Sequence, residues 1–389
     1  MKSLLVLGRQ KNIALSELES LYGAENFTRI NDDIVGCELN PEDIDFHRLG
    51  GSVKLASFIR EYNYTDWNQV ERSITNEIIN LLSLPIEGKM QFGISSYGFD
   101  IQLGKLRNLS LILKNKIKNS GQSIRMIPNQ ELQLNSAQVI HNKLIGQKGS
   151  EILIIKSRFS TIIAKTTEEQ NIDSYSMRDY NRPFRDSRVG MLPPKLAQIL
   201  INLAKPADND IILDPFCGTG VILQEAVIDN LRAYGTDIDQ RMIDYSDGNL
   251  KWLEKAHKID KPVILELGDA TNHEWQSFDC VACETYLGQA YSSYPDKLVL
   301  NKNIQNCDTI ISKFLMNIHD QLPKGKYMAL ALPAWDDRIN KSFISLPLLD
   351  HLEDLGYNRL RFSIIQDEKL FYHRPGQIVA RQLIVITRN

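Results

Sequence analysis

The chain has 389 residues, of which 43% are hydrophobic and 24% are charged, and its formal net charge is −3. Single domains usually contain roughly 100–200 residues, so this length predicts two or three folding units. The composition excludes a disordered or fibrous protein, and the slightly acidic total argues against a uniformly basic nucleic-acid binder.

The first 165 residues alternate strand-like runs with helical patterns, which predicts an α/β region. We expect strands at Leu4–Leu7, Val35–Leu39, Met90–Ser95, Ser123–Ile127, Glu151–Ile155 and Thr161–Lys165, and helices at Ala14–Tyr22, Trp67–Leu82, Leu106–Lys118 and Ser136–Leu144. We divide the region into an α/β subdomain at residues 1–60 and a second domain at residues 61–165. The apolar start is interpreted as a strand rather than a signal peptide, because no small-residue cleavage site follows it.

Residues 166–190 are polar, charged and aromatic without a sustained period, so we interpret them as a linker. Residues 191–389 then alternate helices and strands, which predicts a doubly wound parallel sheet. We expect helices at Pro193–Ala204, Val221–Asp229, Arg241–His257 and Ile304–Gln321, and strands at Ile211–Leu213, Arg232–Thr236, Val263–Leu267, Asp279–Cys283 and Tyr327–Leu332. Two last strands, at Leu360–Ile365 and Gln382–Thr387, are expected to pair antiparallel at the sheet edge.

Basic residues are concentrated between Gly104 and Lys165, where eleven lysines and arginines face only Glu131 and Glu151. A local excess of about +9 in an acidic chain is the expected footprint of a phosphate-binding surface. A solvated basic face is the alternative interpretation. The candidate phosphate contacts are Lys105, Arg107, Lys114, Lys116, Lys118 and Arg125.

The run Asp214-Pro215-Phe216-Cys217-Gly218-Thr219-Gly220 follows a predicted strand and precedes a predicted helix. Gly218 and Gly220 allow the backbone to approach a ligand closely, and the turn lacks the Gly-x-Gly-x-x-Gly pattern of dinucleotide sites. The Asp214 carboxylate suits a positively charged amino-acid group. We assign Asp214, Pro215, Phe216, Gly218 and Gly220 to a cofactor site, with a purely structural turn as the alternative.

Two further aspartates follow the next two predicted strands. Asp237 lies about 20 residues after the glycine turn, where an acidic residue accepts from ribose hydroxyls in nucleoside sites. Asp269 is placed to accept from the exocyclic amine of adenine, with Ala270 beside the ring. Either aspartate alone is more often a cap or turn residue, but the pair in register predicts a nucleoside site.

At this point the sequence resembles the class I methyltransferases of the tRNA guanine-N2 type with an N-terminal THUMP domain, the archaeal and eukaryal guanosine-10 family. The segments that carry the resemblance are Leu7-Gly8-Arg9, Leu15–Glu19, Arg178–Pro183, Leu192–Ala197, Asn202–Ala204 and Asp214–Gly220. The resemblance implies a Rossmann-like methyltransferase sheet with an antiparallel last strand, preceded by an α/β THUMP-like region over residues 61–165. It also implies S-adenosylmethionine as cofactor and a THUMP region that holds the acceptor end of tRNA.

One motif departs from that family. Such enzymes carry Asp/Asn-Pro-Pro-Tyr after the fourth strand, whereas this chain reads Glu284-Thr285-Tyr286-Leu287-Gly288. A target exocyclic amine needs positioned acceptors as it loses its proton, and an aromatic ring to hold the base. We therefore expect Glu284 and Tyr286 to be the catalytic pair. Because both prolines are absent, the motif does not identify the atom that is methylated. An RNA-binding module without catalytic activity is therefore an alternative interpretation.

Two other features admit more than one interpretation. One interpretation of Cys280 and Cys283 is that they supply a cysteine nucleophile for pyrimidine-carbon methylation. Their position in a strand that is expected to be buried favours the other interpretation, which is core packing. The segment Phe371–Gln377 mixes aromatic and basic residues, so Arg374 is a further candidate RNA contact. Rival substrates for a methyltransferase are ribosomal RNA and the adenine or cytosine amines of DNA.

The five cysteines form an odd set without paired metal-ligand spacing. Free thiols are typical of a reducing compartment, so we expect a cytoplasmic protein with no metal site. No segment of the sequence is apolar over the length that crosses a bilayer, so no membrane partner is expected.

Overall fold

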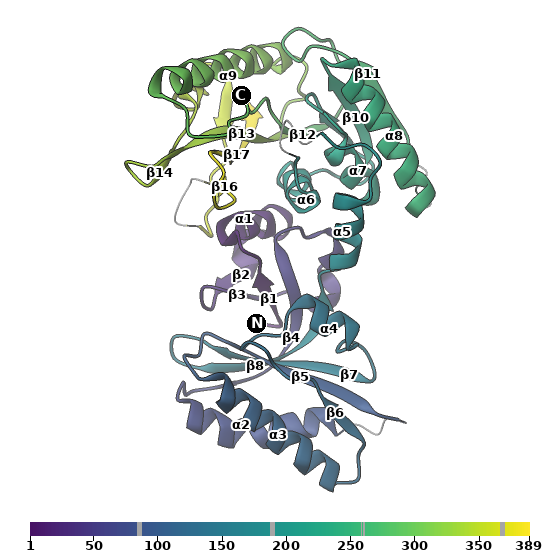
Figure 1. Cartoon of the computed structure of the whole chain (residues 1–389), viewed down its shortest axis with the longest axis vertical. Coiled ribbons are helices and arrows are strands. Elements are labelled where there is room, and N and C mark those ends of the chain that lie inside the picture. Colours follow the sequence, from purple (N-terminus) through teal and green to yellow (C-terminus); the bar gives the residue numbers. More distant parts are fainter. Residues whose placement is uncertain (84–87, 187–190, 258, 260, 366–369) are drawn as a thin grey trace. The chain divides into compact units, whose positions relative to one another are not determined.

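The computed structural model describes residues 1–83, 88–186, 191–257, 259, 261–365 and 370–389 (Figure 1). These residues form two compact units. The first unit contains Met1–Lys11, Glu25–His47 and Gly51–Ser174, and the second contains Asn12–Ala24, Arg48–Gly50 and Tyr175–Asn389. Residues 187–190, at the end of the predicted linker, lie outside the described ranges. Within those ranges, no helix is both long and apolar enough to cross a membrane.

One eight-stranded sheet forms the first unit, in the order β2-β3-β1-β4-β8-β7-β5-β6. Its strands are β1 (Ser3–Leu7), β2 (Phe27–Arg29), β3 (Ile34–Cys37), β4 (Ser52–Tyr62), β5 (Met90–Tyr97), β6 (Ile124–Met126), β7 (Gly149–Lys156) and β8 (Thr161–Glu169). Its helices are α2 (Trp67–Leu82), α3 (Leu103–Asn119) and α4 (Ser136–His141), with short 3₁₀ turns at Ala24–Asn26, Pro41–Asp43 and Phe46–Arg48. The helices α2 and α3 lie side by side and bury their apolar faces on this sheet (Figure 1).

The strand β4 was not predicted, and it changes the domain division. It pairs antiparallel with β1 on one side and with β8 on the other. Register shifts interrupt its pairing with β8, so its side chains do not alternate regularly along the sequence. Because β4 joins strands from both predicted N-terminal regions, residues 1–60 and 61–165 share one sheet in the structure.

A buried charged cluster lies inside the first unit. Lys54 on β4 donates to Glu151 Oε1 at 2.6 Å and lies 3.6 Å from Glu169 Oε2. Glu151 also accepts from the Ser95 and Thr166 hydroxyls. Burial raises the pKa of Glu169 to about 7. Lys54 and Glu151 thus form a buried, hydrogen-bonded ion pair, which offsets part of the cost of burying their charges.

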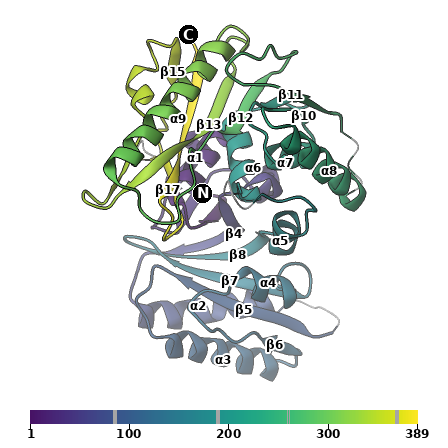
Figure 2. The same cartoon turned by 45° about the horizontal axis from the view of Figure 1, so that its top comes forward.

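The second unit contains a nine-stranded sheet in the order β11-β10-β9-β12-β13-β17-β15, with β14 and β16 attached to β13 and β17 (Figure 2). Its strands are β9 (Ile211–Asp214), β10 (Arg232–Asp237), β11 (Val263–Leu267), β12 (Cys280–Glu284), β13 (Tyr327–Asp337), β14 (Ser342–Ile344), β15 (Tyr357–Arg359), β16 (Leu370–Tyr372) and β17 (Val379–Arg388). The strands from β11 to β13 run parallel, and β17 is antiparallel to β13 as expected.

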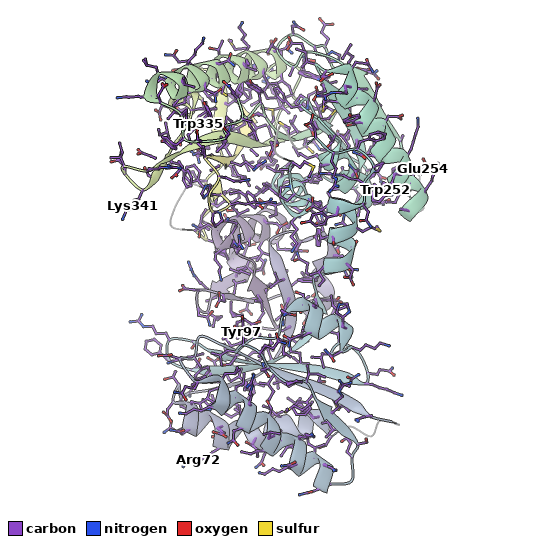
Figure 3. All side chains as sticks on the ribbon, in the orientation of Figure 1. Arg72, Tyr97, Trp252, Glu254, Trp335 and Lys341 are labelled. Carbon is purple, nitrogen blue, oxygen red and sulfur yellow. The ribbon has the colours of Figure 1, made fainter. Side chains whose placement is uncertain are left out.

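The second unit also contains helices, several of which pack on its sheet. They are α1 (Lys11–Tyr22), α5 (Ile172–Tyr180), α6 (Pro194–Leu203), α7 (Val221–Ile228), α8 (Gln240–His257) and α9 (Lys297–Ile318), with a 3₁₀ turn at Pro347–His351. The apolar side of α9 packs on alternate residues of the strands, in a core that includes the fully buried Trp335 (Figure 3). The observed elements confirm the α/β fold.

The first part of the predicted linker, residues 166–190, has regular secondary structure. β8 continues to Glu169, and α5 follows it. Polar contacts within the second unit anchor α5, because Arg178 binds Glu225 at 2.7 Å and Tyr175 donates to Gln198. A helix held by buried polar groups shows little apolar periodicity, so its sequence looks irregular.

The strand predicted at Leu360–Ile365 is also misplaced. The edge strand is β15, and just beyond it the Leu360 amide donates to the Val385 carbonyl. The carboxylate of Glu19 on α1 instead accepts from the backbone amides of Ser363 and Ile364, each at 2.9 Å. The segment is therefore held by a helix side chain rather than by a strand ladder.

The helix α1 contributes a second buried contact to this unit. Glu17, which is fully buried, accepts from the Asn202 side chain at 2.7 Å and from the Gly50 amide at 2.9 Å. The segments Leu15–Glu19 and Asn202–Ala204, which carry part of the family resemblance, thus meet in the structure.

Candidate functional site

The predicted site residues gather at one edge of the second sheet. Asp214, Asp237 and Glu284 are the last residues of β9, β10 and β12, and Asp269 lies two residues beyond β11. These strands are parallel, so their carboxyl ends share one edge. The strand order reverses between β9 and β12, which is where open α/β sheets bind ligands.

The glycine turn has the backbone geometry that its sequence predicts. Gly218 and Gly220 have φ angles of +52° and +77°, a region that side chains disfavour. A Cβ atom at Gly220 would lie 2.8 Å from Ser246 Oγ, whereas one at Gly218 would meet only the Phe216 carbonyl, at 3.9 Å. The turn therefore packs against α8 at Gly220 and leaves room beside Gly218.

Asp237, at the end of β10, connects this strand to the glycine turn by a hydrogen bond. Its Oδ2 accepts from the Gly218 amide and its Oδ1 from the Asp239 amide, both at 2.9 Å. A carboxylate offers about four acceptor positions, so two backbone bonds leave capacity for hydroxyl donors. Asp269 Oδ1 accepts from the Thr271 amide and hydroxyl, at 2.9 and 2.8 Å, and Ala270 is buried.

Three carboxyl groups with raised pKa values lie at this edge. Asp214 is 3% exposed, and its Oδ1 accepts from the Phe216 amide at 3.1 Å. Burial raises the pKa of Asp214 well above its usual range, and the neighbouring Asp237 and Glu284 raise it further. Burial also raises the pKa of Asp237. A cationic group bound here would offset this repulsion, so the donor set fits a cofactor with a positively charged amino-acid group.

Phe216 and Pro215 support the turn from the core side. The Phe216 ring meets Phe314 of α9 edge-on, with centroids 5.1 Å apart. The Pro215 carbonyl accepts from the Thr236 hydroxyl at 3.4 Å. Both contacts are structural, and they position the glycine turn.

Glu284 has a partner that the sequence analysis did not identify. Arg381 on β17 donates through Nε to Glu284 Oε1, and the side chains are 6% and 15% exposed. Burial raises the pKa of Glu284, while Arg381 opposes that rise. One signal for this partner was present in the sequence, because Arg381 is a charged residue that immediately precedes the mostly apolar run Gln382–Thr387.

Tyr286 lies in the loop after β12, half-buried against the core that includes Cys307. The preceding Thr285 anchors the loop, because its amide donates to the Ala331 carbonyl at 3.1 Å. Gly288 has a φ angle of +81°, and a Cβ atom there would meet the Asn303 side chain at 2.6 Å. The loop lacks the two prolines of the family motif, and a backbone hydrogen bond and close packing hold it instead.

The cysteines near the site are core residues. Cys280 and Cys283 are fully buried. Burial raises the pKa of Cys280 to about 12 and that of Cys283 well above its usual range. A thiol that resists ionisation is a poor nucleophile, so the structure supports packing over nucleophilic catalysis. Among the described residues, no group of three or more His, Cys, Asp or Glu side chains is arranged to hold a metal ion.

Most of the predicted phosphate contacts lie on α3 in the first unit. Lys105, Lys116 and Lys118 are exposed and Lys114 is half-buried. Helical spacing puts Lys105 and Lys116 on one flank of the exposed face and Lys114 and Lys118 on the other. The remaining contacts are Arg107, whose guanidinium donates to the Asn129 carbonyl; Arg125, which is exposed on β6; and Arg374, which donates to the Tyr372 hydroxyl at 3.4 Å in the second unit.

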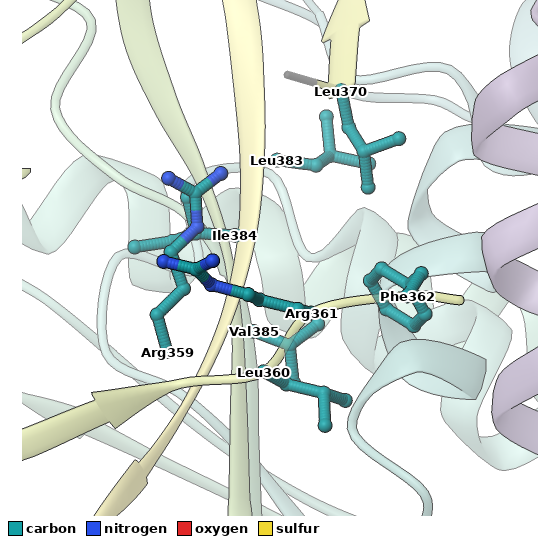
Figure 4. Close-up of a pocket in the computed structure, with 8 residues that line it drawn as sticks. All are labelled: Arg359, Leu360, Arg361, Phe362, Leu370, Leu383, Ile384 and Val385. Carbon is teal, nitrogen blue, oxygen red and sulfur yellow. The ribbon is translucent and has the colours of Figure 1, made fainter. Parts of the chain in front are cut away.

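Figure 4 shows a small pocket in the second unit whose lining includes none of the site carboxylates. Its lining residues are Arg359, Leu360, Arg361, Phe362, Leu370, Leu383, Ile384 and Val385. None of them belongs to the glycine turn or to the loop after β12. The pocket is therefore not the candidate cofactor site.

Comparisons with known proteins show which proteins the chain is similar to. The model of the RMKL-like methyltransferase domain matches residues 181–306. The chain is 38% identical over 114 residues to a tRNA (guanine(10)-N2)-dimethyltransferase of Methanocaldococcus jannaschii, a match covering 28% of this chain and 32% of that protein. It is 32% identical over 161 residues to the protein of the same name from Methanothermobacter thermautotrophicus, covering 41% and 43%. The chain thus matches less than half the length of these curated relatives.

The whole chain also resembles a solved structure. The crystal structure of TrmN from Thermus thermophilus superimposes with a TM-score of 0.55, covering 100% of both chains at 15% sequence identity. A likeness at this identity shows the fold. The chain therefore has the fold of Rossmann-like methyltransferases, and its residues 181–306 are similar to the RMKL-like methyltransferase domain.

Proposed function

We propose that the chain transfers a methyl group from S-adenosylmethionine to the exocyclic N2 amine of a guanine in tRNA. The observation that carries this proposal is the row of Asp214, Asp237 and Glu284 at the carboxyl ends of adjacent parallel strands, at the point where strand order reverses. The names of the curated relatives support tRNA guanine-N2 as the target. The RMKL-like domain match supports the methyltransferase chemistry.

Residues at the carboxyl ends of β9, β10 and β11 would hold the cofactor. Asp214, buried among other acids, would bind the positive amino group, and Asp237 would accept from the ribose hydroxyls. Asp269 would accept from the adenine amine, with Ala270 beside the ring. The open space next to Gly218 leaves room for the ligand, while Pro215 and Phe216 fix the turn from behind.

The loop after β12 would hold the target base. When bound, the cofactor supplies an electrophilic methyl carbon on a sulfonium. Glu284 would accept from the guanine amine, orient its lone pair toward that carbon and take the proton that the amine loses. Tyr286, which is half-buried in the same loop, would stack on the base.

The first unit would supply much of the affinity for RNA. Its exposed lysines on α3 and Arg125 on β6 suit phosphates rather than bases, because they are long, charged and solvated. We propose that this THUMP-like region binds tRNA and that the protein acts in the cytoplasm. Arg374, near the last strands, would be a further RNA contact.

Single-turnover methylation of an unfractionated tRNA pool, followed by mass spectrometry of the nucleosides, tests the proposal. We expect labelled N2-methylguanosine or its dimethyl form from the wild type, and a rate about 100- to 10,000-fold lower from Glu284→Gln. Ribosomal RNA and duplex DNA serve as rival substrates. Methylation of those substrates alone would refute the tRNA assignment, and cofactor binding without turnover on any of them would favour an RNA-binding module.

A further inference from the structure

The contact between Glu284 and Arg381 joins two strands that are not neighbours. Glu284 on β12 is in register with Ala331 on β13, and Arg381 on β17 is in register with Pro333 on β13. Adjacent strands lie about 4.8 Å apart and the two register partners are two residues apart on β13, so the two side chains must together span roughly 12 Å across β13. A glutamate and an arginine can do this only where nothing bulky lies between them.

The residue of β13 that is in register with Glu284 is small. Side chains alternate between the faces of a strand, and Cys283, Leu330 and Ile384 point into the core on the α9 side. Glu284, Ala331 and Arg381 therefore share the opposite face. A methyl side chain at Ala331 leaves the path open, and the Arg381 guanidinium reaches Glu284 through Nε.

The groups around Glu284 make the Arg381 guanidinium important for the ionisation of Glu284. The charged and titratable groups that couple to Glu284 are Arg381 from β17, Asp214 from β9 and Cys283 from β12 itself. The Asp214 carboxyl and the Cys283 thiol, when ionised, disfavour a negative charge on Glu284. Arg381 is the group of this set that favours the carboxylate.

We propose that Arg381 is a positioning residue for methyl transfer, whose ion pair holds Glu284 as a carboxylate in a fixed orientation with its second oxygen free for the target amine. This role rests on the proposed function. A protonated Glu284 would present a donor to an amine that itself donates, so the state that Arg381 maintains is the one that can act. Arg381 acts through Glu284 and need not touch the substrate.

The test is the pH dependence of the single-turnover rate of tRNA methylation between about pH 5.5 and 9.5. In the wild type we expect an acidic limb that reports ionisation of Glu284, and Glu284→Gln should lack it. An adjacent opposite charge typically lowers a carboxyl pKa by about 1–3. Arg381→Met should therefore move the limb upward by one pH unit or more, lower the rate about tenfold or more at pH values below both limbs, and recover it at high pH.

Two variants provide the comparison. Arg381→Lys keeps the charge, so its limb should stay within about half a pH unit of the wild type. Arg388→Met, on the same strand but paired with the exposed Asp320, should leave the profile unchanged. Arg381→Gln, which keeps a donor without the charge, replaces Arg381→Met if that variant does not fold, and the same shift is expected.

The outcomes separate this inference from the proposed function. An inactive wild type would refute the proposed function. An active wild type whose acidic limb persists in Glu284→Gln, or stays in place when Arg381 is neutralised, would overturn the role of Arg381 alone. A rate lowered equally at every pH would also overturn it, because loss of a purely structural contact has that signature. Calorimetry with S-adenosylmethionine shows in each case whether the cofactor site is intact.

Discussion

Replacing Asp237 with alanine should weaken binding of S-adenosylmethionine. The wild-type carboxylate accepts from the Gly218 and Asp239 amides at 2.9 Å and has acceptor positions left for ribose hydroxyls. Loss of a hydrogen bond to a charged group costs about 1.5–3 kcal/mol, which corresponds to an affinity roughly 13- to 160-fold lower. The upper part of that range applies if the freed Gly218 amide also disturbs the turn.

Isothermal titration calorimetry with the cofactor measures this loss directly. Asp237→Asn separates the two contributions, because the amide keeps one acceptor oxygen and should fall between alanine and the wild type. Asp247→Ala is the matched control, because Asp247 lies on α8, is 49% exposed and forms an ion pair with Lys251, four residues further along the helix, at 2.6 Å. A dissociation constant for Asp237→Ala within twofold of the wild-type value would refute the ribose assignment.

Three other expectations concern RNA binding, the base and stability. Charge reversal at Lys114, Lys116 and Lys118 should flatten the salt dependence of tRNA binding by roughly 0.7–0.9 per lost phosphate contact, and filter binding that shows an unchanged slope would contradict it. Tyr286→Ala should weaken base capture by roughly 1–3 kcal/mol in single-turnover titrations, whereas an unaltered tRNA dependence would exclude stacking. The pKa of Glu169 is raised to about 7 in the folded state, so its contribution is complete below about pH 4.5 and is lost as pH rises through 7. Glu169→Gln should therefore flatten the pH dependence of the unfolding free energy by on the order of 3 kcal/mol, and denaturant titrations at pH 5 and 8 with parallel curves for both proteins would refute it.

Local sequence patterns predicted much of this molecule. The strand-turn-helix run at Asp214–Gly220 and the strand ends at Asp237 and Asp269 are each encoded within a few residues, by apolar periodicity and turn chemistry. Parallel strands then bring their carboxyl ends to one edge. The α/β class, the antiparallel last strand and the shared edge of the site residues could thus be derived before the structure was known. The roles of those residues remain predictions.

Only the tertiary structure decided the features that depend on residues far apart in the chain. Arg381 and Glu284 are 97 residues apart, and Glu17 and Asn202 are 185 apart. Each pair meets because strand register and helix packing bring two polar side chains together, and neither side chain shows its partner in its local pattern. The same reason explains the polar helix α5 within the expected linker and the irregular strand β4 that unites the first sheet. Apolar periodicity reports which face of an element is buried, whereas specific polar partners arise only when those faces meet.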